Sequence, residues 1–170
     1  MSLARRHFLG GLAAAAAAPP AQWKLVVGCD HAGFPLKASV IQTLKSWGNT
    51  VNDIGTYSTA TVDFPDIAQK LCAEIQSGRA QRGVMVCGTG VGACIAVNKI
   101  QGMRAALCHD TYCAHQCVEH DNVNVVCMGA WIIGPKIADE VLHAFLNARF
   151  AIEDPDLKRR VEKLGQMEKR

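Results

Sequence analysis

The sequence shows almost no excess of either charge. It has 18 lysines and arginines against 15 aspartates and glutamates, and Arg5 and Arg6 lie in an N-terminal leader, which leaves 16 basic residues for the remainder. These basic residues are scattered, whereas a nucleic-acid-binding domain concentrates them on one face or stripe. The charge pattern therefore argues against nucleic acid as a partner.

Long apolar runs, internal repeats and low-complexity tracts are also missing after the leader. A membrane-spanning helix needs roughly 20 consecutive apolar residues, and no such run follows residue 21. Hydrophobic residues make up 49% of the chain, enough for a sizeable core at this length. We therefore expect one domain over residues 22–170, with no membrane span in the mature form.

The first 21 residues resemble an export signal. The arginine pair is followed by Phe8 and Leu9, an alanine-rich segment over 11–18 and a proline pair. This pattern is typical of a twin-arginine signal cleaved near residues 18–21, and it predicts a periplasmic protein. The alternative is an alanine-rich N-terminal helix on a protein that stays in the cytoplasm.

Eight cysteines are many for an exported chain, because secreted domains usually pair them in disulfides. Here most of them lie inside apolar or helical runs, as Cys72, Cys94 and Cys127 do, where a cysteine behaves as a small hydrophobic residue. Twin-arginine export moves folded proteins, so such thiols would be buried before they met an oxidant. We expect no disulfide framework.

Short β-rich runs alternate with helical segments after the leader. Strands are predicted at 24–28, 50–52, 83–86, 104–107 and 124–128, and helices at 36–47, 64–77, 93–99, 111–119, 137–147 and 156–168. This alternation predicts an α/β three-layer sandwich, in which a five-stranded parallel sheet is covered on both faces. Ligands of such sheets bind at the carboxyl ends of the strands.

One stretch joins a predicted strand to a helix through a glycine-rich turn. The strand ends at Cys87, and Gly88, Gly90 and Gly92 follow it. This layout directs backbone N–H groups at an anion, and glycine permits the positive φ angles and the close approach. The positive field should lower the pKa of Cys87 and favour a thiolate base. The alternative is a tight turn with a structural cysteine.

Polar residues collect at neighbouring strand ends. Asp30 and His31 follow the first strand, and His109 and Asp110 follow the fourth. A carboxylate, an imidazole and a thiol at one edge of a sheet can move protons on a small oxygenated substrate.

Several motifs occur together in a specific order and spacing. They are Gly28-Cys29-Asp30-His31-Ala32-Gly33, Asp63-Phe64-Pro65, Cys87-Gly88-Thr89-Gly90-Val91-Gly92, Asn98-Lys99 and Gly102-Met103-Arg104-Ala105-Ala106. Over residues 24–150 the chain resembles the type B ribose-5-phosphate isomerases, whose relatives include galactose-6-phosphate isomerase. The resemblance implies a Rossmann-like fold, a homodimer or tetramer with active sites between subunits, and aldose–ketose isomerisation of a sugar or sugar phosphate without metal or cofactor.

The resemblance also implies roles for individual residues. Cys87 is the base that moves a proton between C1 and C2 of the sugar, Thr89 assists the transfer, and His120 opens the sugar ring in the partner subunit's site. His31 joins this catalytic set and contacts the sugar. The expected substrate-binding residues are Asp30, Gly88, Gly90, Val91, Gly92, Asp121, Trp131 and Arg160, and the C-terminal helix is expected to pack on the partner subunit.

The sequence departs from the family pattern after Cys108. The family's Arg-x-His-Asn run reads Val118-Glu119-His120-Asp121, Trp131 stands where the family has a phosphate-binding arginine, and residues 152–156 replace a Gly-Gly-Arg-His segment. The default substrate is ribose 5-phosphate. The alternative is an unphosphorylated sugar, because an indole suits the C–H face of a neutral sugar and free sugars reach the periplasm.

Parts of the sequence are also compatible with two other functions. The alternating glycines with Asp110 could bind a dinucleotide, but their spacing differs from the established fingerprint. A metal-binding module could use histidines and cysteines of one segment, although a single helix supplies only part of a tetrahedral site. The residues of this second alternative are Cys108, His109, Cys113, His115, Cys117 and His120.

Overall fold

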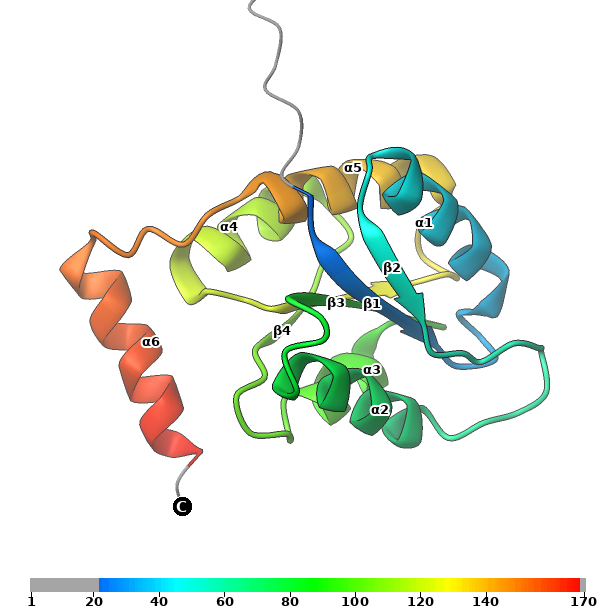
Figure 1. Cartoon of the computed structure of the whole chain (residues 1–170), viewed down its shortest axis with the longest axis horizontal. Coiled ribbons are helices and arrows are strands. Elements are labelled where there is room, and N and C mark those ends of the chain that lie inside the picture. The colour runs from blue at the N-terminus through cyan, green and yellow to red at the C-terminus, as the bar shows by residue number, and fades with distance from the viewer. Residues whose placement is uncertain (1–21, 169–170) are drawn as a thin grey trace, which may run out of the picture.

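The computed structural model describes residues 22–168, so the proposed export signal lies outside the described residues (Figure 1). The strands are β1 (Lys24–Cys29), β2 (Thr50–Asp53), β3 (Arg82–Cys87), β4 (Ala105–Leu107) and β5 (Val125–Gly129). The helices are α1 (Phe34–Ser46), α2 (Phe64–Gln76), α3 (Val91–Val97), α4 (Thr111–Asp121), α5 (Pro135–Asn147) and α6 (Pro155–Met167).

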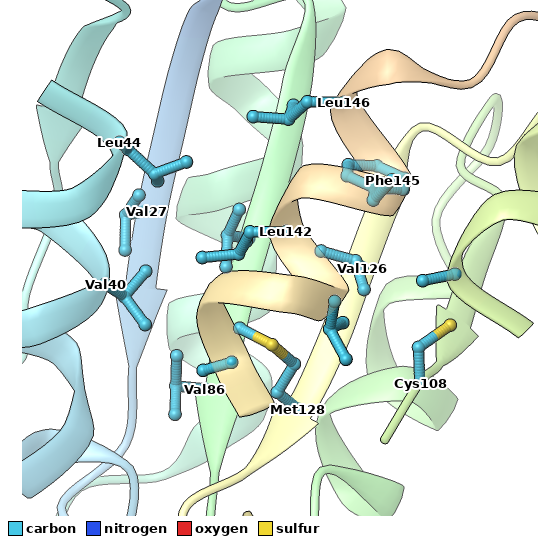
Figure 2. Packing of buried hydrophobic residues seen from close by; sticks show 14 of the residues in the cluster. Val27, Val40, Leu44, Val86, Cys108, Val126, Met128, Leu142, Phe145 and Leu146 are labelled. Carbon is cyan, nitrogen blue, oxygen red and sulfur yellow. The ribbon is translucent and has the colours of Figure 1, made fainter. Parts of the chain in front are cut away.

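The five strands form one parallel sheet in the order β2-β1-β3-β5-β4. The central strand β3 is buried along its whole length, as expected of a parallel sheet with both faces covered. Helices α1, α4 and α5 pack on one face, where Leu142 and Phe145 join Val126 and Met128 in a single cluster (Figure 2). Helices α2 and α3 cover the other face. The predicted Rossmann-like α/β sandwich is confirmed.

The helix starts differ from the predicted ones by a few residues for local reasons. Helix α5 begins at Pro135 rather than at residue 137, since proline fits the first helical position, where its missing N–H has no partner to lose. Helix α3 begins at Val91 rather than at residue 93, because Gly90 takes a left-handed conformation with φ of 80° and turns the chain at once into the helix.

Helix α6 projects from the body of the domain beside α4 (Figure 1). Of its 13 residues, Leu157 is the one that is buried. Its far end is tied back by Glu168, whose carboxylate accepts a hydrogen bond from the backbone N–H of Gly102 (2.9 Å). The described part of the chain contains no helix with the length and apolar character that crossing a membrane requires.

The registers of the strands decide what meets at the carboxyl edge of the sheet. Cys29 of β1 pairs with Val86 of β3, and Cys87 of β3 pairs with Gly129 of β5. The segments that follow these three strands therefore start side by side.

Candidate active site

A thiol and a carboxylate share a hydrogen bond at the centre of this edge. Sγ of Cys87 donates to Oδ2 of Asp30 at 2.8 Å. The other carboxylate oxygen, Oδ1, accepts from the backbone N–H of Gly33 at 2.8 Å. Asp30 is 4% exposed and Cys87 is 8% exposed, so the protein largely removes the pair from water. Both side chains are thus fixed in position before any ligand binds.

The pKa of the Cys87 thiol is raised, and the predicted lowering is wrong. Burial is the largest cause, and the hydrogen bond to Asp30 and the negative charge of that carboxylate add to it. The N–H groups of Gly90 and Gly88 also act on the sulfur and favour the thiolate, but their effect is smaller. Cys87 is therefore a protonated thiol at rest, with a proton acceptor 2.8 Å away.

The glycine-rich turn is packed tightly against the end of β5. A Cβ atom on Gly129 would lie 2.7 Å from the carbonyl group of Thr89, so the two backbones can approach only without a side chain there. The N–H of Ala130 donates to the Cys87 carbonyl at 2.9 Å. The Thr89 hydroxyl is exposed and accepts from the N–H of Val91 at 3.4 Å. The turn is consequently held against the end of β5, and Thr89 is its exposed hydroxyl residue.

The indole of Trp131 lies on this turn. The backbone N–H of Trp131 donates to the Gly88 carbonyl at 3.0 Å. A Cβ atom on Gly88 would lie only 2.8 Å from Cζ3 of the indole ring. Trp131 is nevertheless 72% exposed. The ring thus forms an open aromatic wall next to Gly88, which directly follows Cys87.

Histidines flank the same edge on two sides. His31 follows Asp30, and its Nδ1 accepts from the N–H of Val62 at 3.4 Å. Nε2 of His109 accepts from the N–H of Gly129 at 2.9 Å, so the proton of this ring belongs on Nδ1. Burial lowers the pKa of His109, which keeps it neutral. His109 thereby holds the segment that presents Trp131, a positioning role that its sequence pattern did not reveal.

The carboxylate of Asp110 is engaged at the N-terminus of α4. It caps this helix by accepting from the N–H of Cys113 at 2.8 Å. This contact argues against the ribose-binding role that the dinucleotide alternative requires. The metal alternative finds no support either, since residues 22–168 hold no group of three or more His, Cys, Asp or Glu side chains placed for a metal ion.

Three of the expected site residues lie away from Cys87. Helix α4 starts after the carboxyl end of β4 and ends just before β5 begins, so His120 and Asp121 lie at the opposite edge of the sheet. Nδ1 of His120 is 3.2 Å from the Gln116 amide. Arg160 is exposed on α6. The subunit therefore brings together Cys87, Thr89, Asp30, His31 and Trp131 with the glycine turn, and leaves His120, Asp121 and Arg160 apart.

A cleft of about 790 Å³ lies at this opposite edge of the sheet, between the start of β4 and α6. Its lining includes Lys99, Arg104, Cys117, Asp121 and Leu164. It is remote from the thiol–carboxylate pair and does not form part of the site around Cys87.

Replacing Asp30 should make Cys87 more acidic. In Asp30→Asn the amide oxygen can still accept from the Gly33 N–H, but the negative charge that disfavours the thiolate is gone. We expect the pH midpoint of Cys87 alkylation, followed by mass spectrometry, to move to lower pH. Asp66→Asn, which changes an exposed carboxylate on α2, is the control. An unchanged or higher midpoint in Asp30→Asn would refute the assigned cause of the raised pKa.

Comparison with known proteins assigns the family. The sequence model described as Ribose/Galactose Isomerase matches residues 25–164. The chain is 40% identical to a D-erythrulose-4-phosphate isomerase of Pectobacterium atrosepticum, over 85% of this chain and 94% of that protein. It is 35% identical to the ribose-5-phosphate isomerase B of Escherichia coli, over 86% and 97%. The Clostridium thermocellum ribose-5-phosphate isomerase B has a similar structure, with a TM-score of 0.82 at 36% identity over 85% and 97% of the two chains. The chain belongs to the ribose/galactose isomerase family.

Proposed function

We propose that this aldose–ketose isomerase uses Cys87 as its base and passes through an enediolate, with conversion of ribose 5-phosphate to ribulose 5-phosphate as the default reaction. The observation that carries the proposal is the buried hydrogen bond from Cys87 to Asp30 beside the glycine-rich turn. Relatives named for isomerisation of ribose 5-phosphate and of D-erythrulose 4-phosphate support the substrate class.

The raised pKa of Cys87 suits a thiolate base that forms only during the reaction. Asp30 accepts the thiol proton, and the thiolate then takes a proton from the carbon next to the sugar carbonyl. The electron pair of that C–H bond moves to the carbonyl oxygen and gives the enediolate. Returning a proton to the neighbouring carbon completes the isomerisation, so hydrogens are relocated and no external oxidant or reductant is consumed.

The turn and its neighbours supply the rest of the proposed site. Backbone donors from Gly88 to Gly92 stabilise the enediolate oxygens, and one such donor can be worth about 3 kcal/mol. The Thr89 hydroxyl, which is exposed, moves the proton between the two oxygens. Asp30, His31 and Val91 contact the sugar, and Trp131 forms the wall of the pocket.

We also propose that the working enzyme is a homodimer or tetramer, in which His120, Asp121 and Arg160 complete the site of the partner subunit. These residues lie away from Cys87 within one subunit, as a shared site requires. Helix α6 would pack on the partner, because its apolar residues Leu164 and Met167 are exposed in the single subunit.

Complementation between two inactive variants tests the shared site. Cys87→Ala and His120→Ala each damage every site of their own homodimer. In a mixed dimer one site carries both changes and the other carries neither. Statistical mixing should therefore restore roughly one quarter of the wild-type activity, because a two-fold dimer has two equivalent sites. Mixing Cys87→Ala with Cys87→Ser is the control and should restore nothing. If the mixture of Cys87→Ala and His120→Ala forms mixed dimers but recovers no activity, His120 does not belong to the neighbouring subunit's site.

A second candidate substrate is an unphosphorylated sugar. The observation that favours it is the open indole of Trp131, which suits a C–H face, at a position where the family binds phosphate with arginine. A charge-assisted hydrogen bond contributes about 1.5–3 kcal/mol. A tryptophan in place of the family's arginine therefore weakens the binding of a sugar phosphate, unless Arg160 supplies the missing contact. A tetrose 4-phosphate is the other option, by similarity to the D-erythrulose-4-phosphate isomerase.

An isomerisation assay with ribose 5-phosphate, a tetrose 4-phosphate and free pentoses and hexoses separates these options. If a free sugar is the substrate, it should turn over at least as well as the phosphates, and Trp131→Ala should lower its kcat/KM more than Arg160→Ala does. Lys158→Ala, an exposed cation on α6, is the charge control. Turnover of phosphates alone, abolished by Arg160→Ala, would exclude the free sugar.

Export is proposed on the sequence of the leader alone. Residues 1–21 would be a twin-arginine signal and 22–170 the isomerase domain, and the family match begins only at residue 25. Cell fractionation should find the mature protein in the periplasm, and replacing Arg5 and Arg6 by lysine should retain it in the cytoplasm. Equal cytoplasmic retention of both forms would refute export.

A further inference from the structure

Two free thiols touch on the α4 side of the sheet. Cys108 directly follows β4, and Cys117 lies on the inner face of α4, with 4.0 Å between the two sulfur atoms. They are 1% and 8% exposed and belong to the cluster shown in Figure 2, where Cys108 is labelled. A disulfide needs a sulfur–sulfur distance of about 2.05 Å, so the two sulfur atoms must approach each other by about 2 Å for the bond to form.

The two thiols differ in access. Cys117 lines the cleft of about 790 Å³ between β4 and α6, and it is the cysteine in that lining. Cys108 lies behind it, against the end of the strand. In the single subunit, a small oxidant that enters the cleft therefore meets the sulfur of Cys117 first.

The contact between the two sulfur atoms shifts the pKa values of the two thiols in opposite directions. The hydrogen bond from Cys108 lowers the pKa of Cys117, and the guanidinium of Arg82 acts in the same direction, while burial and Asp121 oppose them. The same hydrogen bond, with burial, raises the pKa of Cys108. Cys117 is thus the more acidic of the two thiols, and Cys108 keeps its proton more strongly.

We propose that Cys108 and Cys117 form a redox pair, which a hydroperoxide converts into an intramolecular disulfide. The Cys117 thiolate attacks one peroxide oxygen, the O–O bond breaks, and the leaving oxygen departs as hydroxide or alkoxide and takes up a proton. Cys117 is then a sulfenic acid. The sulfur of Cys108 attacks that of Cys117, the S–O bond breaks, and the hydroxyl leaves as water with the Cys108 proton. The two thiols lose two electrons, which the peroxide gains.

The bond would close a loop around the start of α4. Residues 108–117 include His109, which holds the Gly129 segment, and Asp110, which caps the helix. Tying both ends of this loop together restricts opening of the first turns of α4. We therefore expect slower amide hydrogen exchange over residues 111–117 after oxidation. None of this depends on the proposed isomerase activity.

Other thiols are less well placed for such a pair. Cys87 is buried with a raised pKa, and Cys113 is exposed but the carboxylate of Asp110 raises its pKa. Cys94 is the main rival, because a hydrogen bond from Cys127 lowers its pKa to about 7. Cys94 belongs to α3 and packs against the hydrophobic cluster on the other face of the sheet. Peptide mapping distinguishes its oxidation from that of Cys117.

The test is disulfide mapping of the full-length protein in its native oligomer after treatment with hydrogen peroxide. Free thiols are alkylated, and cleavage after Tyr112 then separates the peptides that carry Cys108 and Cys117. We expect a linked pair of these peptides, lighter by two hydrogen atoms than the separate thiol peptides. Dithiothreitol should release both, and exchange over α4 should return to the reduced rate.

Matched variants identify the partners. The link should survive in Cys113→Ser and be lost in Cys117→Ser, with Cys72→Ser as the control for a buried thiol elsewhere. The mapping of the unaltered chain needs no variant, so a variant that fails to fold does not remove the test. The proposal is overturned if Cys108 and Cys117 remain alkylatable while Cys94 or Cys113 is oxidised.

Discussion

Close packing of the carboxyl ends of β1, β3 and β5 is the constraint on which the site depends. Gly33 lies against the backbone of Val86, and Gly129 lies against Thr89, at distances that exclude a Cβ atom. These contacts bring Asp30 over the end of β3, where it meets Cys87. They also bring the indole of Trp131 onto the glycine-rich turn. The geometry around Cys87 thus follows from backbone contacts rather than from flexible side chains.

The same packing explains why the thiol is not ionised at rest. A short glycine turn followed by a seven-residue helix supplies some positive field, but burial and a carboxylate 2.8 Å away oppose it. In the proposed mechanism the Cys87 thiolate, once its proton has moved to Asp30, is a strong proton acceptor because its pKa is raised. The low exposure of Cys87 and Asp30 would then help to return the proton to the neighbouring carbon, as an isomerase requires.

The fold was predictable because hydrophobic runs and glycine positions are local signals. The strand before Cys87, the turn after it and the alternation of strands and helices all depend on neighbouring residues. The direction of the Cys87 pKa shift was not predictable in this way, since it depends on the burial of the thiol in the folded domain and on its contact with Asp30, 57 residues away in the chain. The positioning role of His109 was missed for the same reason, because its partner is the backbone of Gly129. The separation of His120 from Cys87 follows from the topology, and the resemblance had placed that histidine in a neighbouring subunit's site.

The proposed role of Cys87 as the base is most directly tested by the turnover of Cys87→Ala. The strand and turn do not need the sulfur, so circular dichroism should match the wild type. A positioned base typically contributes 10²–10⁴-fold in rate, and we expect a loss of about that size for whichever sugar or sugar phosphate the wild type isomerises. Cys87→Ser should retain little activity, because an alkoxide is far harder to form than a thiolate. Cys113→Ala should keep normal turnover. A folded Cys87→Ala protein with near-normal turnover would contradict the mechanism.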